Sequence, residues 1–326
     1  MNITVIGGSG FIGSSLCARL ESSGSKFQIV DKKPSDSFNE KVFIADIRFP
    51  LEKSLATDVI INLAAEHRDD VSPISLYDET NIDGAKNICK FAEDNKIDKI
   101  VFTSSVAVYG FAPLGTDESG TINPFNDYGR TKWEAELVYK AWQSRDPNKR
   151  CLVIVRPTVV FGERNRGNVF NLLKQIASGK FIMVGNGLNR KSMAYVENVA
   201  AFLEYSMTFK AGIHIFNYID KPDFSMNQLV VHVNKLLGRS SKIGLRLPYI
   251  VGLSVGKLFD IGAKLTGHKF SISSIRVKKF CANSVYESAI SGTGFVPPVN
   301  LVHAIEKTVR YEFIEEHPNA QVFYSE

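Results

Sequence analysis

The chain has 326 residues, of which 44% are hydrophobic and 22% are charged, a composition typical of a globular protein with one large domain or two coupled lobes. Its net charge of +5 is modest, so we expect no nucleic-acid partner. Its longest notable apolar run, Leu247–Gly256, is well short of the ~20 residues of a membrane-spanning helix. Met1–Ile6 leads straight into a glycine turn, unlike a signal peptide, so we expect a cytoplasmic protein. Neither the cysteines nor the histidines show metal-ligand spacing, which predicts free thiols and no metal site.

Short runs rich in Val and Ile alternate with amphipathic stretches through the first half of the chain. The predicted strands are Asn2–Ile6, Lys26–Val30, Val42–Ile44, Asp58–Leu63, Lys99–Thr103 and Leu152–Arg156. The predicted helices between them are Ile12–Ser22, Tyr77–Asp94 and Tyr128–Ser144. This alternation predicts an α/β fold with a doubly wound parallel sheet of the Rossmann type and a ligand site at the carboxyl ends of its strands. We assign residues 1–160 to this domain, with some later segments returning to it.

The pattern loosens after Arg156. The remaining predicted elements are helices Asn168–Ser178, Val196–Met207 and Met226–Leu237 and strand Ile213–Asn217. No linker rich in Pro, Gly or Ser separates the two halves, so we expect one continuous cleft between them. Residues 161–326 are predicted to form mainly a smaller C-terminal lobe that binds the substrate.

Residues 239–279 carry nine basic side chains and one acidic side chain, Asp260. The basic residues are Arg239, Lys242, Arg246, Lys257, Lys264, Lys269, Arg276, Lys278 and Lys279. They form either a solvated basic face or a surface that contacts phosphates or an anionic membrane. Within this segment, Pro248–Leu265 is either a buried helix or an apolar surface that rests on a bilayer.

A glycine-rich turn follows the first predicted strand and opens the first predicted helix. Its G-x-x-G-x-x-G spacing lets the backbone approach a pyrophosphate, which the helix N-terminus then binds. Asp31, at the end of the second strand, is placed to accept hydrogen bonds from ribose hydroxyls, which favours NAD over NADP, although Lys32 and Lys33 weaken that preference. We therefore predict NAD as the cofactor. The expected contacts here are Gly7, Gly10, Phe11, Ile12, Gly13 and Asp31, with Asp46 and Ile47 beside the adenine.

Tyr128 and Lys132 are four residues apart at the start of a predicted helix, so their side chains share one face. The ammonium group stabilises a phenolate, which lowers a tyrosine pKa that is ordinarily near 10. A tyrosine tuned in this way can take the proton of a sugar hydroxyl while a hydride leaves the same carbon.

Taken in order, these motifs resemble the NAD-dependent epimerase/dehydratase family of extended short-chain dehydrogenases along essentially the whole chain. The motifs are the glycine turn, Asp31, Asn62–Ala65, Phe102–Gly110, Tyr128–Lys132 and Arg156–Gly162. The resemblance implies that Ser105, Tyr128 and Lys132 are catalytic. It also implies that Ala64, Ala65, Asn81, Ser104, Tyr128 and Lys132 contribute to the cofactor site. Val106 and Ala107 stand where related dehydratases carry an acidic pair, so dehydration is not expected.

Three further stretches are similar to those of the N-acetyl-α-D-glucosaminyl-diphospho-undecaprenol 4-epimerases within that family. They are Glu66–Pro73, Phe161–Asn168 and Lys191–Val196. The resemblance implies 4-epimerisation of an N-acetylhexosamine linked through diphosphate to undecaprenol, in O-antigen biosynthesis. The implied substrate contacts are His67, Arg164, Arg166, Asn168, Lys191, Arg276 and Asn283. We further expect peripheral attachment to the inner face of the cell membrane through residues 239–279, which would receive the polyprenyl tail.

The sequence leaves other activities open. One is 4-epimerisation of UDP-GlcNAc or UDP-glucose, another is reduction of a 4-keto sugar, and a third is non-catalytic NAD(P) sensing, against which the intact Ser105, Tyr128 and Lys132 argue. We also expect a homodimer in which helices Tyr77–Asp94 and Tyr128–Ser144 pair with their copies through apolar residues such as Leu137 and Trp142.

Overall fold

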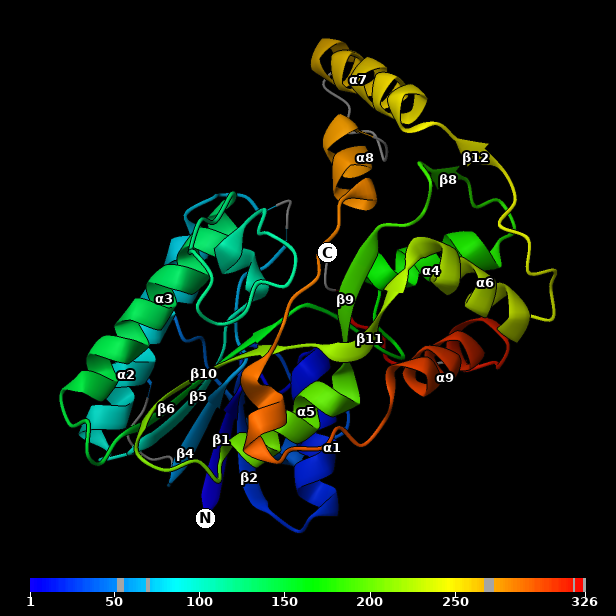
Figure 1. The fold of residues 1–326 in the computed structure, drawn as a ribbon. Helices are drawn as coiled ribbons and strands as arrows, with labels where there is room; N and C mark the ends of the chain where they lie inside the picture. Colours follow the sequence, from blue (N-terminus) through cyan, green and yellow to red (C-terminus); the bar gives the residue numbers. More distant parts are fainter. Residues whose placement is uncertain (52–55, 69–70, 267–272, 319, 325–326) are drawn as a thin grey trace.

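The computed structural model describes residues 1–51, 56–68, 71–266, 273–318 and 320–324. Three residues of the segments discussed above lie outside the described residues. They are Asp69 and Asp70 of Glu66–Pro73, and Lys269 of the basic segment. The centre of the fold is a seven-stranded sheet in which every neighbouring pair is parallel (Figure 1). Its strands, in spatial order, are β10 (Gly212–Tyr218), β6 (Cys151–Pro157), β5 (Lys99–Thr103), β4 (Val59–Asn62), β1 (Asn2–Ile6), β2 (Lys26–Asp31) and β3 (Val42–Ile44).

Helices cover both faces of this sheet. The helices α1 (Phe11–Ser22) and α5 (Val196–Ser206) pack on one face, and α2 (Gly84–Asp94) and α3 (Asp127–Ser144) on the other. Successive strand residues point to opposite faces, so on β5 Val101 packs in the α1/α5 core whereas Ile100 and Phe102 pack in the α2/α3 core. The predicted α/β class is therefore confirmed. The segments that return from beyond residue 160 are α5 and β10.

The strand order reverses direction between β1 and β4, which creates a crevice at the carboxyl ends of these strands. A smaller lobe lies across this end of the sheet (Figure 1). It holds a three-stranded sheet of β7 (Val159–Phe161), β9 (Arg190–Tyr195) and β11 (Asp220–Ser225), and the helices α4 (Asn168–Ala177), α6 (Met226–Leu236) and α9 (Leu301–Phe313). One hydrophobic cluster joins these helices to β7 and β9, which fixes the far wall of the crevice.

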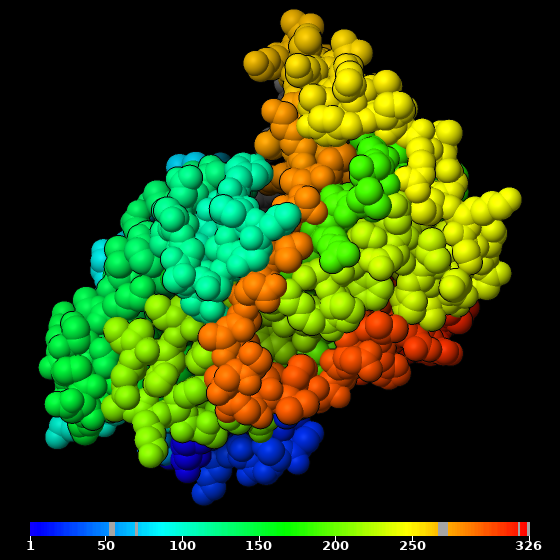
Figure 2. All heavy atoms as spheres, viewed as in Figure 1, coloured from blue at the N-terminus to red at the C-terminus, as the bar shows by residue number. Residues whose placement is uncertain are grey.

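Two helices project from the smaller lobe as a hairpin, α7 (Tyr249–Thr266) and α8 (Ser274–Cys281), beyond the strand pair β8 (Met183–Val184) and β12 (Arg246–Leu247) (Figures 1 and 2). The buried residues of α7 are Gly252 and Gly256. A Cβ atom at Gly252 would lie 2.6 Å from Val184 Cγ1, and one at Gly256 2.8 Å from the Ser274 backbone, so both glycines permit close packing at this junction. The buried-helix alternative for Pro248–Leu265 is wrong, because most of α7 faces solvent.

Candidate active site

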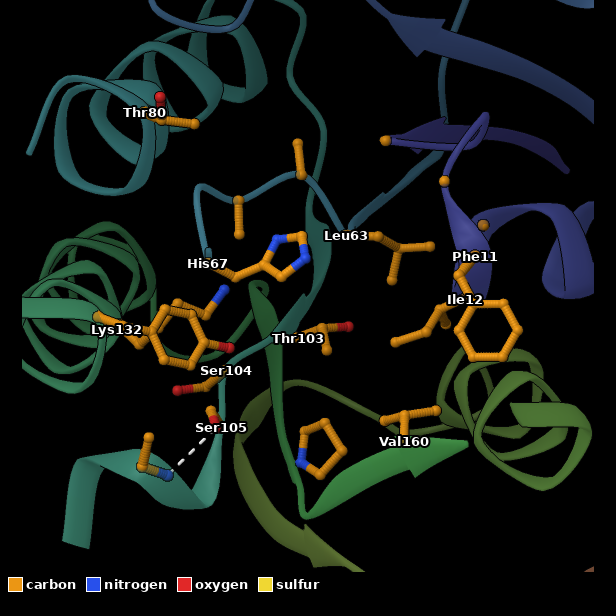
Figure 3. Close-up of a pocket in the computed structure, with 18 of the residues that line it drawn as sticks. Phe11, Ile12, Leu63, His67, Thr80, Thr103, Ser104, Ser105, Lys132 and Val160 are labelled. Carbon is orange, nitrogen blue, oxygen red and sulfur yellow. Dashed lines mark hydrogen bonds between the residues drawn. The ribbon is translucent and has the colours of Figure 1, made fainter. Parts of the chain in front are cut away.

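A cleft of about 560 Å³ lies at the carboxyl ends of the central strands, between the sheet and the smaller lobe (Figure 3). The turn after β1 forms one wall. Gly7 has a φ of +79°, and a Cβ at Gly13 would lie 2.3 Å from the Gly7 carbonyl oxygen, so the turn and the start of α1 require glycine at both positions. Gly10 precedes α1 and the helix start carries no side-chain cap, which leaves its first amide groups available to an anion.

The acidic residues expected around the adenosine also line this cleft. The Asp31 carboxylate accepts hydrogen bonds from the backbone amides of Ser9 and Lys33, each at 3.1 Å. Burial raises the pKa of Asp31, and the two amide bonds act in the opposite direction. For Asp46, burial also acts to raise the pKa, but the hydrogen bonds from Arg48 outweigh it and hold the pKa below its usual value. Ile47 completes this end of the cleft.

The three residues expected to be catalytic all line this cleft, and Figure 3 shows Ser105 and Lys132 on the same side of it. Ser105 follows β5, while Tyr128 and Lys132 lie on the first turns of α3, which begins at an Asn126 side chain that accepts a hydrogen bond from the Gly129 amide at 3.0 Å. The lowered pKa expected for Tyr128 is not found: burial raises the pKa of its phenol, and the hydrogen bond to Ser105 acts in the opposite direction. The three side chains are therefore within reach of one bound group.

Lys132 is almost completely buried, with 2% of its surface exposed and its Nζ 4.4 Å from the centre of the Phe102 ring. Burial lowers its pKa from 10.5 to about 7, although the nearby Glu136 carboxylate acts in the opposite direction. The pKa of Lys132 therefore lies near neutral pH, so a modest change in its surroundings changes its charge.

This pKa shift predicts a pH-dependent contribution to stability. Between pH 7 and pH 10.5 the unfolded chain holds a proton on Lys132 that the folded chain releases, so raising the pH in this window favours the folded state. In urea unfolding of the NAD-free protein, the wild type should gain stability relative to Lys132→Met between pH values of about 7 and about 9.5. A difference between the two proteins that stays constant with pH would contradict the shift.

A buried network beneath the catalytic residues was not predicted from the sequence. The Glu136 carboxylate accepts hydrogen bonds from Ser104 Oγ at 2.7 Å and from Arg156 Nε and Nη2 at 2.8 and 2.6 Å. Arg156 also donates to the Tyr109 hydroxyl at 2.6 Å. Glu136 is 0% exposed and Arg156 2% exposed. The network joins the end of β5, the middle of α3 and β6, and so holds Ser105 and α3 in register.

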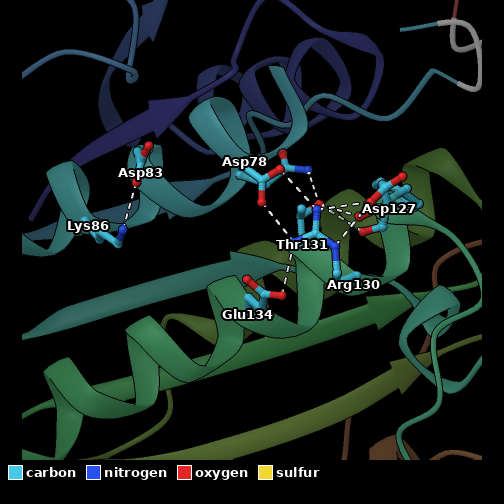
Figure 4. A network of polar contacts seen from close by, with 9 residues as sticks. Asp78, Asp83, Lys86, Asp127, Arg130, Thr131 and Glu134 are labelled. Carbon is cyan, nitrogen blue, oxygen red and sulfur yellow. Dashed lines mark hydrogen bonds and ion pairs between the residues drawn. The ribbon is translucent and has the colours of Figure 1, made fainter. Parts of the chain in front are cut away.

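Asn81, expected to contribute to the cofactor site, is not among the described residues that line the cleft. Its side chain bonds to both backbone groups of Glu66, at 2.9 and 3.0 Å, and donates to Thr131 Oγ1 at 2.9 Å. Beside it, Arg130 makes a bidentate ion pair with Asp78 and also contacts Asp127 and Glu134 (Figure 4). Asn81 therefore ties the loop after β4 to α3 rather than forming a wall of the cleft.

Of the expected substrate contacts, His67 and Asn168 line the cleft. Two arginines shortly before Asn168, Arg164 and Arg166, bond to a glutamate outside the cleft. Arg166 forms a 2.9 Å ion pair with the buried Glu312 carboxylate, and the Arg164 backbone amide donates to the same carboxylate at 2.6 Å. Neither arginine is among the described residues that line the cleft, so the geometry does not support direct contact with a sugar diphosphate there.

The remaining expected substrate contacts also lie outside the described lining of the cleft. Lys191 Nζ donates to the carbonyls of Lys279 and Ala282 at 2.9 and 3.1 Å and so fastens the C-terminal end of α8. The Asn283 side chain accepts from the Arg190 amide at 2.7 Å and anchors the start of β9. Arg276 is exposed on α8. Lys191 and Asn283 therefore hold the base of the α7–α8 hairpin, a role that their spacing in the sequence did not indicate.

Other lining residues were missed, among them Thr103. Its hydroxyl is buried and has no hydrogen-bond partner within the described protein, although it faces the cleft. A buried polar group left unpaired is costly, so its orientation fits a polar ligand in the cleft. Together with the uncapped start of α1 and the Asp31 carboxylate, it fits bound NAD. Thr80, Phe125, Asn165 and Tyr286 also line the cleft and were not predicted.

The sheet order, the glycine turn at its switch point and the Ser-Tyr-Lys group are those of a dinucleotide-binding protein of the short-chain dehydrogenase/reductase type. Residues 3–217 match the model of the NAD dependent epimerase/dehydratase family, and the chain belongs to that family. The expected family and its NAD cofactor are thereby confirmed.

The chain is similar to curated epimerases over most or all of its length. It is 46% identical, over its full length and 99% of the relative, to an N-acetyl-alpha-D-glucosaminyl-diphospho-ditrans,octacis-undecaprenol 4-epimerase of Escherichia coli O157:H7. It is 27% identical to a UDP-glucose 4-epimerase of Vibrio cholerae, with 82% of this chain and 85% of that one aligned. The fold superposes with a TM-score of 0.72 on a UDP-glucuronic acid 4-epimerase from Bacillus cereus in complex with NAD, at 19% identity and covering 95% of this chain and 98% of that one.

Proposed function

We propose that the protein is a 4-epimerase of an N-acetylhexosamine carried on undecaprenyl diphosphate, which interconverts the GlcNAc and GalNAc forms. The observation that carries this proposal is the 46% identity, over full length, to the Escherichia coli enzyme of that name. The UDP-glucose 4-epimerase of Vibrio cholerae is much less similar, at 27% identity. In this proposal residues 1–160, with α5 and β10, bind NAD, and most of residues 161–326 hold the substrate.

The side chains of the cleft supply the proton chemistry. Tyr128 takes the proton of the sugar 4-hydroxyl while Ser105 donates a hydrogen bond to the same oxygen, and the charged form of Lys132 stabilises the resulting phenolate. Bound NAD supplies the hydride acceptor and donor at C4. Tyr128 then returns the proton to the 4-keto oxygen after the sugar has presented its opposite face, which inverts the carbon. Gly7, Gly10 and Asp31 are proposed to hold the cofactor, with His67 and Asn168 on the sugar side.

An epimerase of this kind regenerates its cofactor within each turnover. The purified protein should therefore carry NAD and convert GlcNAc-diphospho-polyprenol to the GalNAc form without added nucleotide. A 4-keto-sugar reductase would instead consume NADPH in proportion to product. Val106 and Ala107, which follow Ser105, offer no carboxylate for water elimination, so no dehydrated product should form.

We further propose that α7 rests on an anionic membrane. Ile250, Leu258, Ile261 and Leu265 are spaced for one helical face and are 75%, 68%, 55% and 82% exposed. This face lies opposite the buried glycines of α7, and the exposed Lys257 and Lys264 border it. An apolar helical stripe beside lysines is typical of a helix that lies in the membrane interface. Across the described residues, no helix is long and apolar enough to span a membrane.

The membrane proposal predicts salt-sensitive binding to anionic vesicles. Each lysine near such a surface contributes about 1 kcal/mol, and the exposed leucines and isoleucines add apolar burial. The protein should float with phosphatidylglycerol vesicles at low salt, float less at high salt and remain unbound to phosphatidylcholine vesicles. Leu258→Glu with Leu265→Glu should abolish flotation. Ile314→Glu, at a site after α9 that is 50% exposed, should not. Equal flotation of the two variants would contradict the role of α7.

We also propose a homodimer formed by α2 and α3. Leu137 is 46% exposed on α3, and the neighbouring Ala141 is exposed as well. The expectation that Trp142 contributes to this interface is wrong, because it is 1% exposed and packs in the core between α3 and the sheet. Sedimentation velocity should show a dimer at micromolar concentration that Leu137→Glu converts to a monomer. A wild-type monomer under these conditions would contradict the proposal.

A further inference from the structure

An aromatic pair stands where the cleft opens toward the α7–α8 hairpin. Phe125 lines the cleft three residues before Tyr128, and its ring centre lies 4.8 Å from that of Phe111. The two side chains are 46% and 63% exposed, so their rings present apolar surface at the opening. Lys279 of α8 places its Nζ 5.1 Å from the centre of the Phe125 ring, which brings a cation to the same place.

The loop that carries this pair, residues 110–125, is bonded to neighbouring segments at several points. Gly110 has a φ of +65°, and a Cβ there would lie 2.1 Å from the Asn123 carbonyl oxygen, so the two ends of the loop approach closely. The Asn123 amide donates to the Val108 carbonyl at 3.0 Å, and the Gly115 amide donates to the Val285 carbonyl at 2.9 Å. The loop is therefore attached both to the helical turn Val106–Tyr109 that follows Ser105 and to the segment that follows α8.

This arrangement connects the reacting centre with α8. Phe125 lines the same cleft as Tyr128. Its ring also contacts Lys279 of α8, the helix that packs against α7. Figure 2 shows α8 and the exposed loop side by side at this face of the molecule. Leu114 on the loop and Ile275 on α8 add exposed apolar side chains, at 63% and 46%.

We infer that the Phe111–Phe125 pair and Lys279 bind the part of the lipid-linked substrate where the diphosphate meets the first isoprene units. This inference rests on the proposed function and identifies the side of the cleft from which the lipid leaves. The ammonium of Lys279 suits the diphosphate, and the two rings suit the branched alkene units that follow it. The rest of the chain then continues along the hairpin toward the apolar face of α7.

A nucleoside fits this opening less well. Uracil and ribose are polar and require directed hydrogen-bond partners when they are covered by protein. The side chains that the contacts place at the opening are the rings of Phe111 and Phe125 and the ammonium of Lys279. These three side chains offer apolar surface to isoprene units and a cation to the diphosphate, but no hydrogen-bond acceptor for the polar edge of a base.

The inference predicts that the aromatic pair makes the enzyme sensitive to lipid length. We would compare GlcNAc-diphospho-undecaprenol with an analogue in which the lipid is a single methyl group. The wild type should have a kcat/KM at least roughly tenfold higher for the long-chain substrate, because apolar surface is buried on binding. Phe111→Ala should remove most of this preference by raising KM for the long-chain substrate alone. Lys279→Gln should raise KM for both substrates alike, because both carry the diphosphate.

Ile314→Ala, a change at an exposed apolar side chain after α9, is the matched control and should leave both substrates unaffected. Turnover of the methyl analogue by Phe111→Ala shows that this variant is folded. If Phe111→Ala lowers kcat/KM equally for both substrates, or changes neither, the lipid contact is wrong while the proposed function stands. If the wild type turns over UDP-GlcNAc but no lipid-linked sugar, the proposed function itself fails, and the inference fails with it.

Discussion

Replacement of Tyr128 by phenylalanine should lower the epimerisation rate by about 10²–10⁴-fold, the usual contribution of a positioned acid–base group. The phenol lies in the cleft in hydrogen-bond contact with Ser105, and in the proposed reaction it is the group that removes and returns the proton of the sugar 4-hydroxyl. Phenylalanine keeps the ring and its packing, so the bound NAD content and the urea midpoint should match those of the wild type. The rate is measured by product analysis under saturating substrate.

Tyr324→Phe is the matched control for this change. Tyr324 is 72% exposed near the C-terminus and is not among the described residues that line the cleft, so its hydroxyl should be dispensable. Turnover of the Tyr128→Phe protein within a few-fold of the wild type would remove Tyr128 from the proposed mechanism. A loss of NAD from that variant would instead point to a role in holding the cofactor.

Glu136→Leu should lower the free energy of unfolding by about 3–5 kcal/mol, the usual cost of removing one partner of a buried ion pair. The change leaves the Arg156 guanidinium buried without its carboxylate and removes the acceptor for Ser104 Oγ. Urea unfolding monitored by circular dichroism gives the loss directly. The displaced β5 end should also reduce kcat, because Ser105 follows Ser104 in the chain.

The double variant Glu136→Leu with Arg156→Met tests the cause of this loss. Removing both charges replaces the pair by apolar side chains of similar size, so much of the stability should return. The ring of Tyr109 would lose its guanidinium partner but retain its bond to Asn217 at 2.8 Å. If the double variant is as unstable as the single one, the loss reflects packing rather than an unpaired charge.

Much of the first half could be predicted from the sequence because local pattern and tertiary role agree there. Strands such as Asn2–Ile6 and Lys99–Thr103 are buried on both faces, so they appear as short runs of Val and Ile, and each agrees with the observed bounds. The glycine turn could also be predicted from the sequence, because a positive φ at Gly7 and close packing at Gly13 require glycine at this spacing.

The elements of the smaller lobe were harder to predict from the sequence, because they are short and their hydrophobic pattern is mixed. Strand β9 begins with Arg190 and Lys191, and β11 contains Pro222, so neither shows a clear alternation. Helix α9 was missed although a signal existed: Asn300 caps it by accepting from the His303 amide at 2.9 Å, and its buried side chains follow a helical repeat.

The substrate side of the cleft depends on pairings that the sequence does not reveal. Arg166 follows a motif that suggested contact with a diphosphate, yet Glu312, far away along the chain, supplies a buried carboxylate that neutralises it. Lys191 likewise caps α8 instead of facing the cleft. Whether a basic residue faces the cleft therefore depends on the carboxylates and carbonyls that the tertiary structure brings beside it.

The most direct test of the proposed function is one assay in which purified protein, without added nucleotide, meets UDP-GlcNAc and GlcNAc-diphospho-undecaprenol in parallel. The product sugars are identified after mild acid release. We predict conversion of the lipid-linked sugar to its GalNAc form with a kcat/KM well above that for UDP-GlcNAc, and no conversion by Tyr128→Phe. Faster epimerisation of UDP-GlcNAc, with little or no conversion of the lipid-linked sugar, would contradict the lipid-linked substrate and leave a UDP-sugar 4-epimerase.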